Sequence, residues 1–400
     1  VPAAITTELT WEKVRSWNVG MDFGLFNNRL TGSFDYYTRY TIDMMGASLE
    51  LPSILGYTTP KTNNTDLMTY GWELELEWKD QLSCGLFYGL KFLLSDSQTI
   101  VTKYPSNTTG SIRQYIPGRK LGEIWGYETI GIAKSQEEMD VHLDRLDQNF
   151  LEANGYYPSE LRQGQSALGS GWGAGDIMYK DLNGDGRIST GDDTIDNHGD
   201  LKVIGNSTPR YHFGIDLNLA WKGIDFRMFF QGVMKRDYWQ SSSYFWGANT
   251  EPEWSAALVQ HLDFYRDEDS KLVQDGIMDI NTDAYYPRPS FDRGGEGHGS
   301  SGRNHQVQTR YLQNAAYIRL KNLQLGYTLP EKWTRPAKIE RLRTYFSAEN
   351  IWTGTSLASM FDPETIDGGN NNTEKDWRTY NNGNAYPLSI QLSFGISITF

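Results

Sequence analysis

The last stretch of the chain, LSIQLSFGISITF at residues 388–400, alternates apolar and polar residues without a break. Leu392 and Phe394 fall on one parity, and Ser393 and Gly395 fall on the other. A period of two is typical of a β-strand with one apolar face and one polar face. A strand that crosses a membrane needs about 9–11 residues, with its apolar side toward lipid and its small polar side toward the lumen. This stretch meets both conditions.

The same alternation recurs along the chain, so we expect about nine antiparallel strands. Glu73, Glu75 and Glu77 share one face of their strand, and three carboxylates in a row must meet water. The parity slips near Lys321 and Asn322, which predicts a β-bulge there. The expected strands cover residues 17–25, 30–36, 72–78, 84–94, 211–221, 224–230, 317–329, 342–348 and 388–400.

The connectors between these strands are unequal in length. Short turns at 26–29, 79–83, 222–223 and 330–339 alternate with long connectors at 41–66, 95–207, 240–310 and 353–386. Short turns at one end and long loops at the other are typical of outer-membrane β-barrels. If the short turns are periplasmic, the long loops are extracellular and the C-terminus is periplasmic.

The number of membrane crossings limits which of the other segments can be membrane-spanning strands. The connector 95–207 must hold an even number of crossings, so the strand-like 123–132 is half of a non-spanning hairpin or has an unrecognised mate. Residues 136–151 are the best candidate for a helix. An odd count of about nine cannot close a bacterial barrel. We therefore expect the first strands to lie outside this sequence, and 388–400 to pair with 342–352 and with a strand outside it.

Composition excludes several classes of protein. The 400 residues carry a net charge of −13, which argues against nucleic acid as a partner. Mean hydropathy is −0.57, and no window approaches the ~18 apolar residues of a transmembrane helix. Aromatic residues make up 14% of the chain, which suits the interfacial belts of a barrel as well as a soluble core. The single cysteine, Cys84, permits no internal disulfide.

The sharpest local motif is DLNGDGRISTGD at residues 181–192, which has the spacing of a calcium loop. Side-chain oxygens stand at positions 1, 3 and 5, a glycine at 6, a backbone carbonyl at 7 and a carboxylate at 12. We expect a structural Ca²⁺ ion in an extracellular loop, with Asp193 as a substitute for the last ligand. The alternative is an ion-free acidic turn. The expected ligands are Asp181, Asn183, Asp185, Arg187 and Asp192.

The long loops also carry aromatic residues that suit sugar-ring stacking or a hydrophobic partner surface. The alternative is that these rings pack the loops against one another. The candidates for substrate contact are Trp239, Tyr244, Trp246, Trp254 and Trp377. The Gly/Ser-rich run 294–304 fits neither a nucleophile elbow nor a phosphate loop, and the six histidines show no metal-ligand spacing. We therefore expect no enzyme activity.

Several runs together resemble the SusC/RagA family of TonB-dependent outer-membrane transporters, over essentially the whole chain. The runs are LTWEKVRSWNVGMDFGLFNNRLTGSFDYY (9–37), LGEIWGYETIGI (121–132), GDIMYKDLNGDGRISTGDDTI (175–195), VIGNSTPRYHFGIDLNLAWKGIDFRMFFQGV (203–233), YIRLKNLQLGYTLP (317–330) and YPLSIQLSFGISITF (386–400).

The resemblance implies an all-β fold, a transmembrane β-barrel of which residues 1–400 form the C-terminal part. They would be about the last nine strands of a 22-strand barrel, with the N-terminal plug outside this sequence. It also implies a SusD-like surface lipoprotein as a lid and the TonB complex as energy source.

Oligosaccharides are the expected substrate and peptides are the alternative within this family. A different interpretation, from the residues alone, is a soluble calcium-binding all-β adhesion domain.

Overall fold

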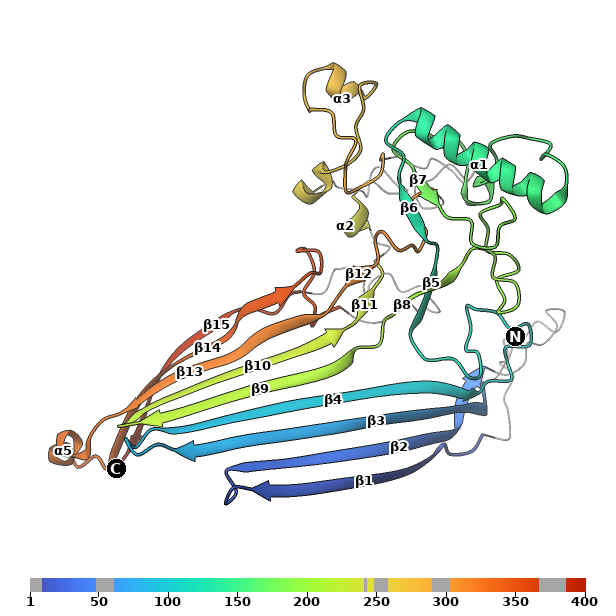
Figure 1. The fold of residues 1–400 in the computed structure, drawn as a ribbon. Helices are drawn as coiled ribbons and strands as arrows, with labels where there is room; N and C mark the ends of the chain where they lie inside the picture. The colour runs from blue at the N-terminus through green and yellow to red at the C-terminus, as the bar shows by residue number, and fades with distance from the viewer. Residues whose placement is uncertain (1–8, 48–60, 241–242, 248–257, 290–302, 367–385) are drawn as a thin grey trace, which may run out of the picture.

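The computed structural model describes residues 9–47, 61–240, 243–247, 258–289, 303–366 and 386–400. Nine long strands lie side by side in one antiparallel sheet (Figure 1). In sheet order they are β1 (Lys13–Leu25), β2 (Leu30–Ala47), β3 (Lys61–Gln81), β4 (Phe87–Lys103), β9 (Arg210–Trp221), β10 (Ile224–Lys235), β13 (Tyr317–Thr328), β14 (Arg341–Thr355) and β15 (Gln391–Thr399). The expectation of nine antiparallel strands is confirmed.

The final strand is one edge of this sheet. β15 pairs with β14 from Arg341 opposite Thr399 to Glu349 opposite Gln391. Within the described residues its other side, like the outer side of β1, has no strand partner. The pairing of 388–400 with the region 342–352 is thus confirmed, and the partner on its free side stays a prediction.

Two local features agree with the sequence. The register of β13 against β14 shifts between Leu320 and Asn322, so the predicted β-bulge is present. Lys222 and Gly223 join β9 to β10 with φ angles of 48° and 87°. Positive φ at both central residues is what a two-residue hairpin turn requires, and glycine adopts it without steric cost.

The long connector 104–209 adds no strand to the large sheet. Its segment 123–132 splits into β5 (Glu123–Gly126), which pairs with β8 (Lys202–Asn206), and β6 (Thr129–Ile132), which pairs with β7 (Ile177–Tyr179). The segment therefore does not span, and its mates lie about 50 to 80 residues later along the chain. A further two-stranded sheet joins β11 (Asp237–Tyr238) and β12 (Gln313–Asn314).

The helices lie outside the large sheet. The predicted helix is α1 (Gln136–Asn154), where the Ser135 side chain caps the first turn and Gly155, at φ 78°, ends the last. α5 (Glu331–Thr334) and η4 (Arg335–Ala337) form the turn between β13 and β14, at the opposite end of the sheet (Figure 1). The other short helices within the described residues are η2 (Ser166–Leu168), α2 (Ser243–Trp246), η3 (Val259–Leu262) and α3 (Lys271–Gln274).

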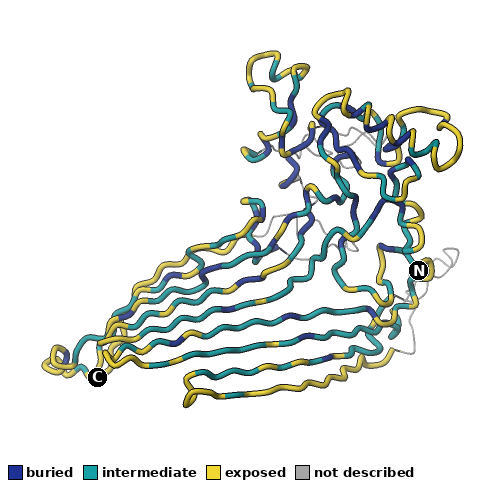
Figure 2. Tube along the Cα trace, viewed as in Figure 1, coloured by how far each residue is buried: buried dark blue, intermediate teal, exposed yellow. Residues whose placement is uncertain are grey.

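The hydrophobic core sits in the long connectors and not in the sheet. Figure 2 shows the buried residues gathered beyond one end of the strands, whereas the strands themselves are mostly intermediate or exposed. We call the described residues of 104–209, 236–316 and 356–366 the loop cap. Every buried member of the core cluster belongs to it, from Ile112 to Ile366.

One face of the sheet is apolar and uncovered. On β15, Leu392 is 65% exposed and Phe394 73% exposed, and on β1 Val19 is 66% exposed. These exposed fractions show that no other described residues cover this face at Leu392, Phe394 or Val19. No helix among the described residues is long and apolar enough to cross a membrane.

The opposite face is polar and carries ion pairs between strands. Lys91 on β4 pairs with Glu75 on β3 at 2.5 Å. Arg343 on β14 reaches across β13 to Asp225 on β10, with Nε to Oδ1 at 2.9 Å. One apolar face and one charged face are what the wall of a membrane barrel needs, so the fold is that of a partial β-barrel.

Candidate functional site

An aromatic cluster forms the centre of the loop cap. The ring of Trp246 lies 4.7 Å from Tyr311, 5.2 Å from Phe245 and 4.0 Å from His305, on which it stacks. Because the site is dehydrated, the pKa of His305 falls to about 3. The cluster joins connector 236–316 to the loop after β14 through Phe361.

Two of the loop aromatics that the sequence singled out belong to this cluster. Trp239 is 9% exposed and Trp246 is 4% exposed, so both rings pack the loops against each other. Tyr244 keeps 37% of its surface accessible. Trp254 and Trp377 lie outside the described residues. A role of these five residues in substrate contact stays a prediction.

A buried polar clamp ties two distant connectors together. The Asp176 carboxylate, fully buried, accepts from Asn304 Nδ2 at 2.9 Å and pairs with Arg288 at 3.3 Å. Arg303 lies 3.8 Å away and donates to the Ser170 carbonyl. A buried carboxylate needs such partners because its desolvation is costly. Sequence reasoning missed this clamp, because Asp176 is more than 100 residues from Arg288 and Asn304.

The expected calcium ligands form a tight acidic turn. The Asp181 carboxylate accepts the backbone N–H groups of Gly184 (2.7 Å) and Gly186 (2.9 Å), and Asn183 Oδ1 accepts that of Asp185 (2.9 Å). The Asp192 carboxylate accepts from Asn197 Nδ2 at 2.8 Å. Within the described residues, no three acidic, histidine or cysteine side chains converge on a common point.

A residue that the sequence did not single out closes this turn. Asp200 is fully buried and accepts the N–H groups of Leu182 at 2.7 Å and Ser189 at 2.9 Å. It thereby fastens both sides of the turn to one carboxylate. Burial raises the pKa of Asp200 to about 6.

Two adjoining cavities open where the loop cap meets the ends of β4, β9 and β10. The first encloses about 420 Å³, and the second about 490 Å³. Both volumes lie in the range of small-ligand sites, about 300–1,000 Å³. Their walls share Lys120, Leu121, Glu123 and Thr208.

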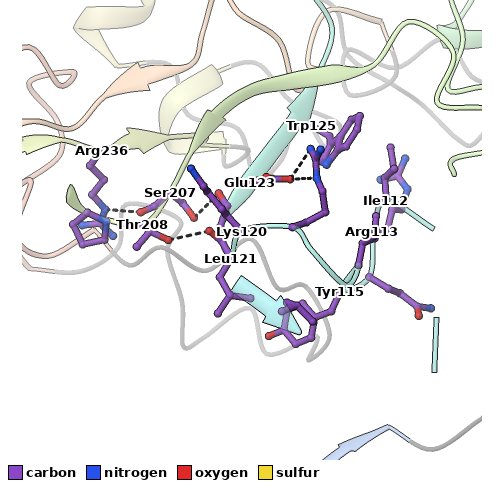
Figure 3. A pocket seen from close by; sticks show the side chains of 16 residues that line it. Ile112, Arg113, Tyr115, Lys120, Leu121, Glu123, Trp125, Ser207, Thr208 and Arg236 are labelled. Carbon is purple, nitrogen blue, oxygen red and sulfur yellow. Dashed lines mark hydrogen bonds and ion pairs between the residues drawn. The ribbon is translucent and has the colours of Figure 1, made fainter. Parts of the chain in front are cut away.

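Figure 3 shows the side chains around the first cavity. Arg236 and Thr208 lie on one side, Arg113 lies on the other, and Lys120 lies between them. Arg119 pairs with Glu123 at 2.8 Å and stacks over the ring of Trp125, 5.3 Å from its centre. Sequence reasoning missed this site, although the basic run 113–120 in an acidic chain was one signal for it.

No family model matches the chain. It is 24% identical over 407 residues to TonB-dependent receptor P3 of Formosa agariphila, covering 98% of this chain and 34% of that protein. It is 22% identical over 403 residues to TonB-dependent receptor SusC of Bacteroides thetaiotaomicron, covering 100% of this chain and 33% of that protein. The chain thus spans about a third of the length of the curated relatives it matches.

A solved structure of the RagAB peptide transporter superposes on the whole chain with a TM-score of 0.67 and 21% identity, covering 37% of that chain. The same transporter in a closed-closed state gives a TM-score of 0.65. The expected resemblance to the SusC/RagA type of TonB-dependent receptor is confirmed. These relatives are receptors and transporters, not enzymes, in agreement with the sequence-based expectation.

Proposed function

We propose, from this kinship with the TonB-dependent receptors, that the chain forms part of an outer-membrane barrel that imports oligosaccharides. The observation that carries the proposal is the division of the molecule into a two-faced sheet and a loop cap with cavities at their junction. The apolar face contacts lipid, the charged face lines the lumen, and the loop cap receives the ligand at the mouth.

The direction of the strands supports an orientation. β1 and β15 both run from the loop-cap end of the sheet to the end with the short turns. In outer-membrane barrels the short turns are periplasmic. We therefore place the loop cap outside the cell and the end of β15 at the periplasmic side.

Two partners belong to the proposal. A SusD-like lipoprotein would close over the loop cap, whose outer surface offers exposed apolar side chains such as Val259 (83%), Ile277 (67%) and Tyr156 (62%). The TonB complex would supply energy through a plug outside this sequence. The chain's own part is to bind and orient the ligand at the mouth of the lumen.

An uptake experiment separates the two substrate classes. Cells that produce the whole receptor are given fluorescently labelled oligosaccharides or peptides, with and without a functional TonB system. We expect TonB-dependent accumulation of oligosaccharides. Peptides are the second candidate, because the structurally similar RagAB is a peptide transporter. Uptake of peptides alone would contradict the oligosaccharide proposal, and uptake of neither would contradict import.

We also propose that the turn 181–192 binds a structural Ca²⁺ ion. Asp181, Asn183 and Asp185 place their oxygens within one tight turn, which suits an oxygen-seeking cation. Asp192 does not fit this arrangement as it lies, so Asp192 or Asp193 would have to reorient. We expect calcium to protect connector 104–209 of the whole protein from protease.

The variant that tests the calcium proposal is Asp181→Ala with Asp185→Ala. Calorimetry with CaCl₂ should show heat for the unchanged protein and none for this variant. The matched control is Asp144→Ala with Asp140→Ala on α1, which should bind calcium as the unchanged protein does. If the two double variants gave equal heat and equal protection from protease, Asp181 and Asp185 would not be calcium ligands. The turn 181–192 would then be an ion-free acidic turn.

A further inference from the structure

The first cavity is basic although the chain as a whole is acidic. Four cations line it, Arg113, Arg119, Lys120 and Arg236, against one carboxylate, Glu123. The net charge of the chain is −13, so its general field repels anions. We propose that this cavity is a subsite for the anionic group of an acidic oligosaccharide, a sugar carboxylate or sulfate. The proposal rests on the proposed function and adds a substrate class to it.

The cations converge from separate parts of the chain. Arg113, Arg119 and Lys120 come from the connector after β4, and Arg236 follows β10 (Figure 3). Arg236 Nε donates to the Ser207 carbonyl at 3.2 Å, which holds the guanidinium at the cavity wall. Placement by backbone groups is what a preorganised anion site needs, because little ordering is left for the ligand to impose.

The charges are only partly neutralised by neighbours. Arg113 pairs through Nε with Asp193, and Arg119 is occupied by Glu123. Lys120 forms no ion pair with any residue that the structure describes. A lysine ammonium has three donors, and an arginine paired through one edge keeps others for a second anion. Lys120 and Arg113 are therefore the groups with donors left for a ligand.

The rest of the wall suits a sugar. Gln114, Tyr115, Ser207 and Thr208 also line the cavity. The Ser207 and Thr208 hydroxyls donate to the Gly122 and Leu121 carbonyls, so they offer a ligand their acceptor lone pairs. Tyr115 is 37% exposed, and its ring meets Tyr104 edge-on at 5.3 Å, which leaves a partly open aromatic surface. Hydroxyl partners with an accessible ring match a polyhydroxylated pyranose better than the mainly amide backbone of a peptide.

The second cavity extends the same groove. It adds Arg210 and Lys235 to the shared Lys120. Arg210 is held by an ion pair with Asp96, and Asp237 accepts the Asn206 N–H at 2.8 Å. Glu123 and Asp237 also line this cavity, and Arg210 is neutralised by Asp96. Lys120 and Lys235 are therefore the cations that it offers to a ligand extending beyond the first cavity.

The test is a binding measurement on the whole receptor in detergent. The probes are an oligogalacturonate, a sulfated galactan oligosaccharide, and the methyl ester of the first as an uncharged counterpart. We expect the double variant Arg113→Gln, Lys120→Gln to weaken binding of a charged probe by about tenfold or more, since a hydrogen bond to a charged group contributes that much. The methyl ester should be unaffected.

The matched control is Lys271→Gln on α3, another exposed lysine away from the cavity, which should change nothing. Salt gives a second measurement on the unchanged protein, where binding of the charged probes should weaken steeply with ionic strength and that of the ester should not. The probe whose affinity the double variant Arg113→Gln, Lys120→Gln reduces more carries the anionic group that the site prefers, a carboxylate or a sulfate.

Equal binding of charged and uncharged oligosaccharides, unchanged by the double variant, would overturn the subsite and leave oligosaccharide import standing. Binding of polyglutamate, but not of the acidic sugars, through Arg113 and Lys120 would also overturn it in favour of an acidic peptide. Failure of the proposed function looks different, because then no oligosaccharide enters cells in the uptake experiment.

Discussion

At the scale of single residues, parity decides what each side chain of the sheet faces. Leu392 and Ser393 are neighbours on β15, yet one belongs to the exposed apolar face and the other to the polar face. A charge therefore costs very different amounts at the two positions. The effect of replacing a glycine also depends on its position. At some positions the missing side chain leaves space that a side chain of a neighbouring strand occupies, and at others that space is empty.

We predict that Leu392→Arg destabilises the barrel by up to about 2–4 kcal/mol, which is the cost of a lipid-facing arginine at the bilayer midplane. Ser393→Arg, on the other face, should cost far less. Heat-modifiable gel mobility and unfolding in lipid vesicles measure both variants. Equal destabilisation would contradict the assignment of the two faces.

Gly326 makes room for an ion pair that crosses a whole strand. A Cβ there would lie 2.5 Å from both Arg343 Nη2 and Asp225 Oδ2. We predict that Gly326→Ala separates this pair and lowers the unfolding temperature. Gly89→Ala is the control, because its Cβ would have 3.7 Å of space. Circular dichroism in detergent measures the unfolding temperature of both variants. An equal decrease in the two variants would mean that the Arg343–Asp225 ion pair does not depend on the absence of a side chain at Gly326.

At the scale of elements, the loop cap is held together by contacts between connectors far apart in sequence. The clamp at Asp176 joins the region of β7 to Arg288 and Asn304. The aromatic cluster joins connector 236–316 to Phe361. Because each connector depends on another, loss of one contact should loosen two segments together.

We predict that Asp176→Asn costs about 3–5 kcal/mol in the loop cap, because Arg303 is then buried without its carboxylate. Hydrogen exchange should rise in both 170–180 and 303–311. The control is Asp144→Asn, which breaks the half-exposed pair with Arg162 and should cost at most about 1 kcal/mol. A rise confined to 170–180 would show that the two segments are not coupled.

At the scale of the whole molecule, the loop cap and the sheet are stabilised by different means. The loop cap buries a core of its own, and the sheet relies on strand pairing and, in our proposal, on lipid. Acid should therefore act on them differently. Three histidines of the loop cap, His142, His261 and His305, have pKa values lowered by burial.

A histidine with a lowered pKa in the folded state binds protons more readily when unfolded, so stability is lost as the pH falls. The loss begins near the unfolded pKa of about 6.5 and continues toward about 3 for His305. We predict faster hydrogen exchange in the loop cap at about pH 5 than at neutrality, after correction for intrinsic rates. The strands should change little.

The variant His305→Phe keeps the ring on Trp246 and removes the titrating group, so it should reduce the acid sensitivity. His212→Gln, on β9, is the control and should leave it unchanged. Equal acid sensitivity in His305→Phe and the unchanged protein would contradict the role of His305.

The sequence by itself determined the number and order of the strands, the bulge near Lys321, the start of the helix at Gln136 and the ends at which the short turns lie, whereas β2, β3 and β4 extend beyond the expected bounds. Strand alternation and turn chemistry are local, so they are visible within a few residues of the chain. The order of these signals along the chain also carried the resemblance to TonB-dependent receptors.

Only the tertiary structure decided where the loop residues go. Burial of Trp239 and Trp246, the clamp at Asp176 and the placement of Arg236 and Arg113 around one cavity depend on contacts between residues far apart in sequence. Alternation says which face of a strand a residue takes, but a long connector has no such period. Its side chains are placed by packing against other connectors, which a linear pattern does not record.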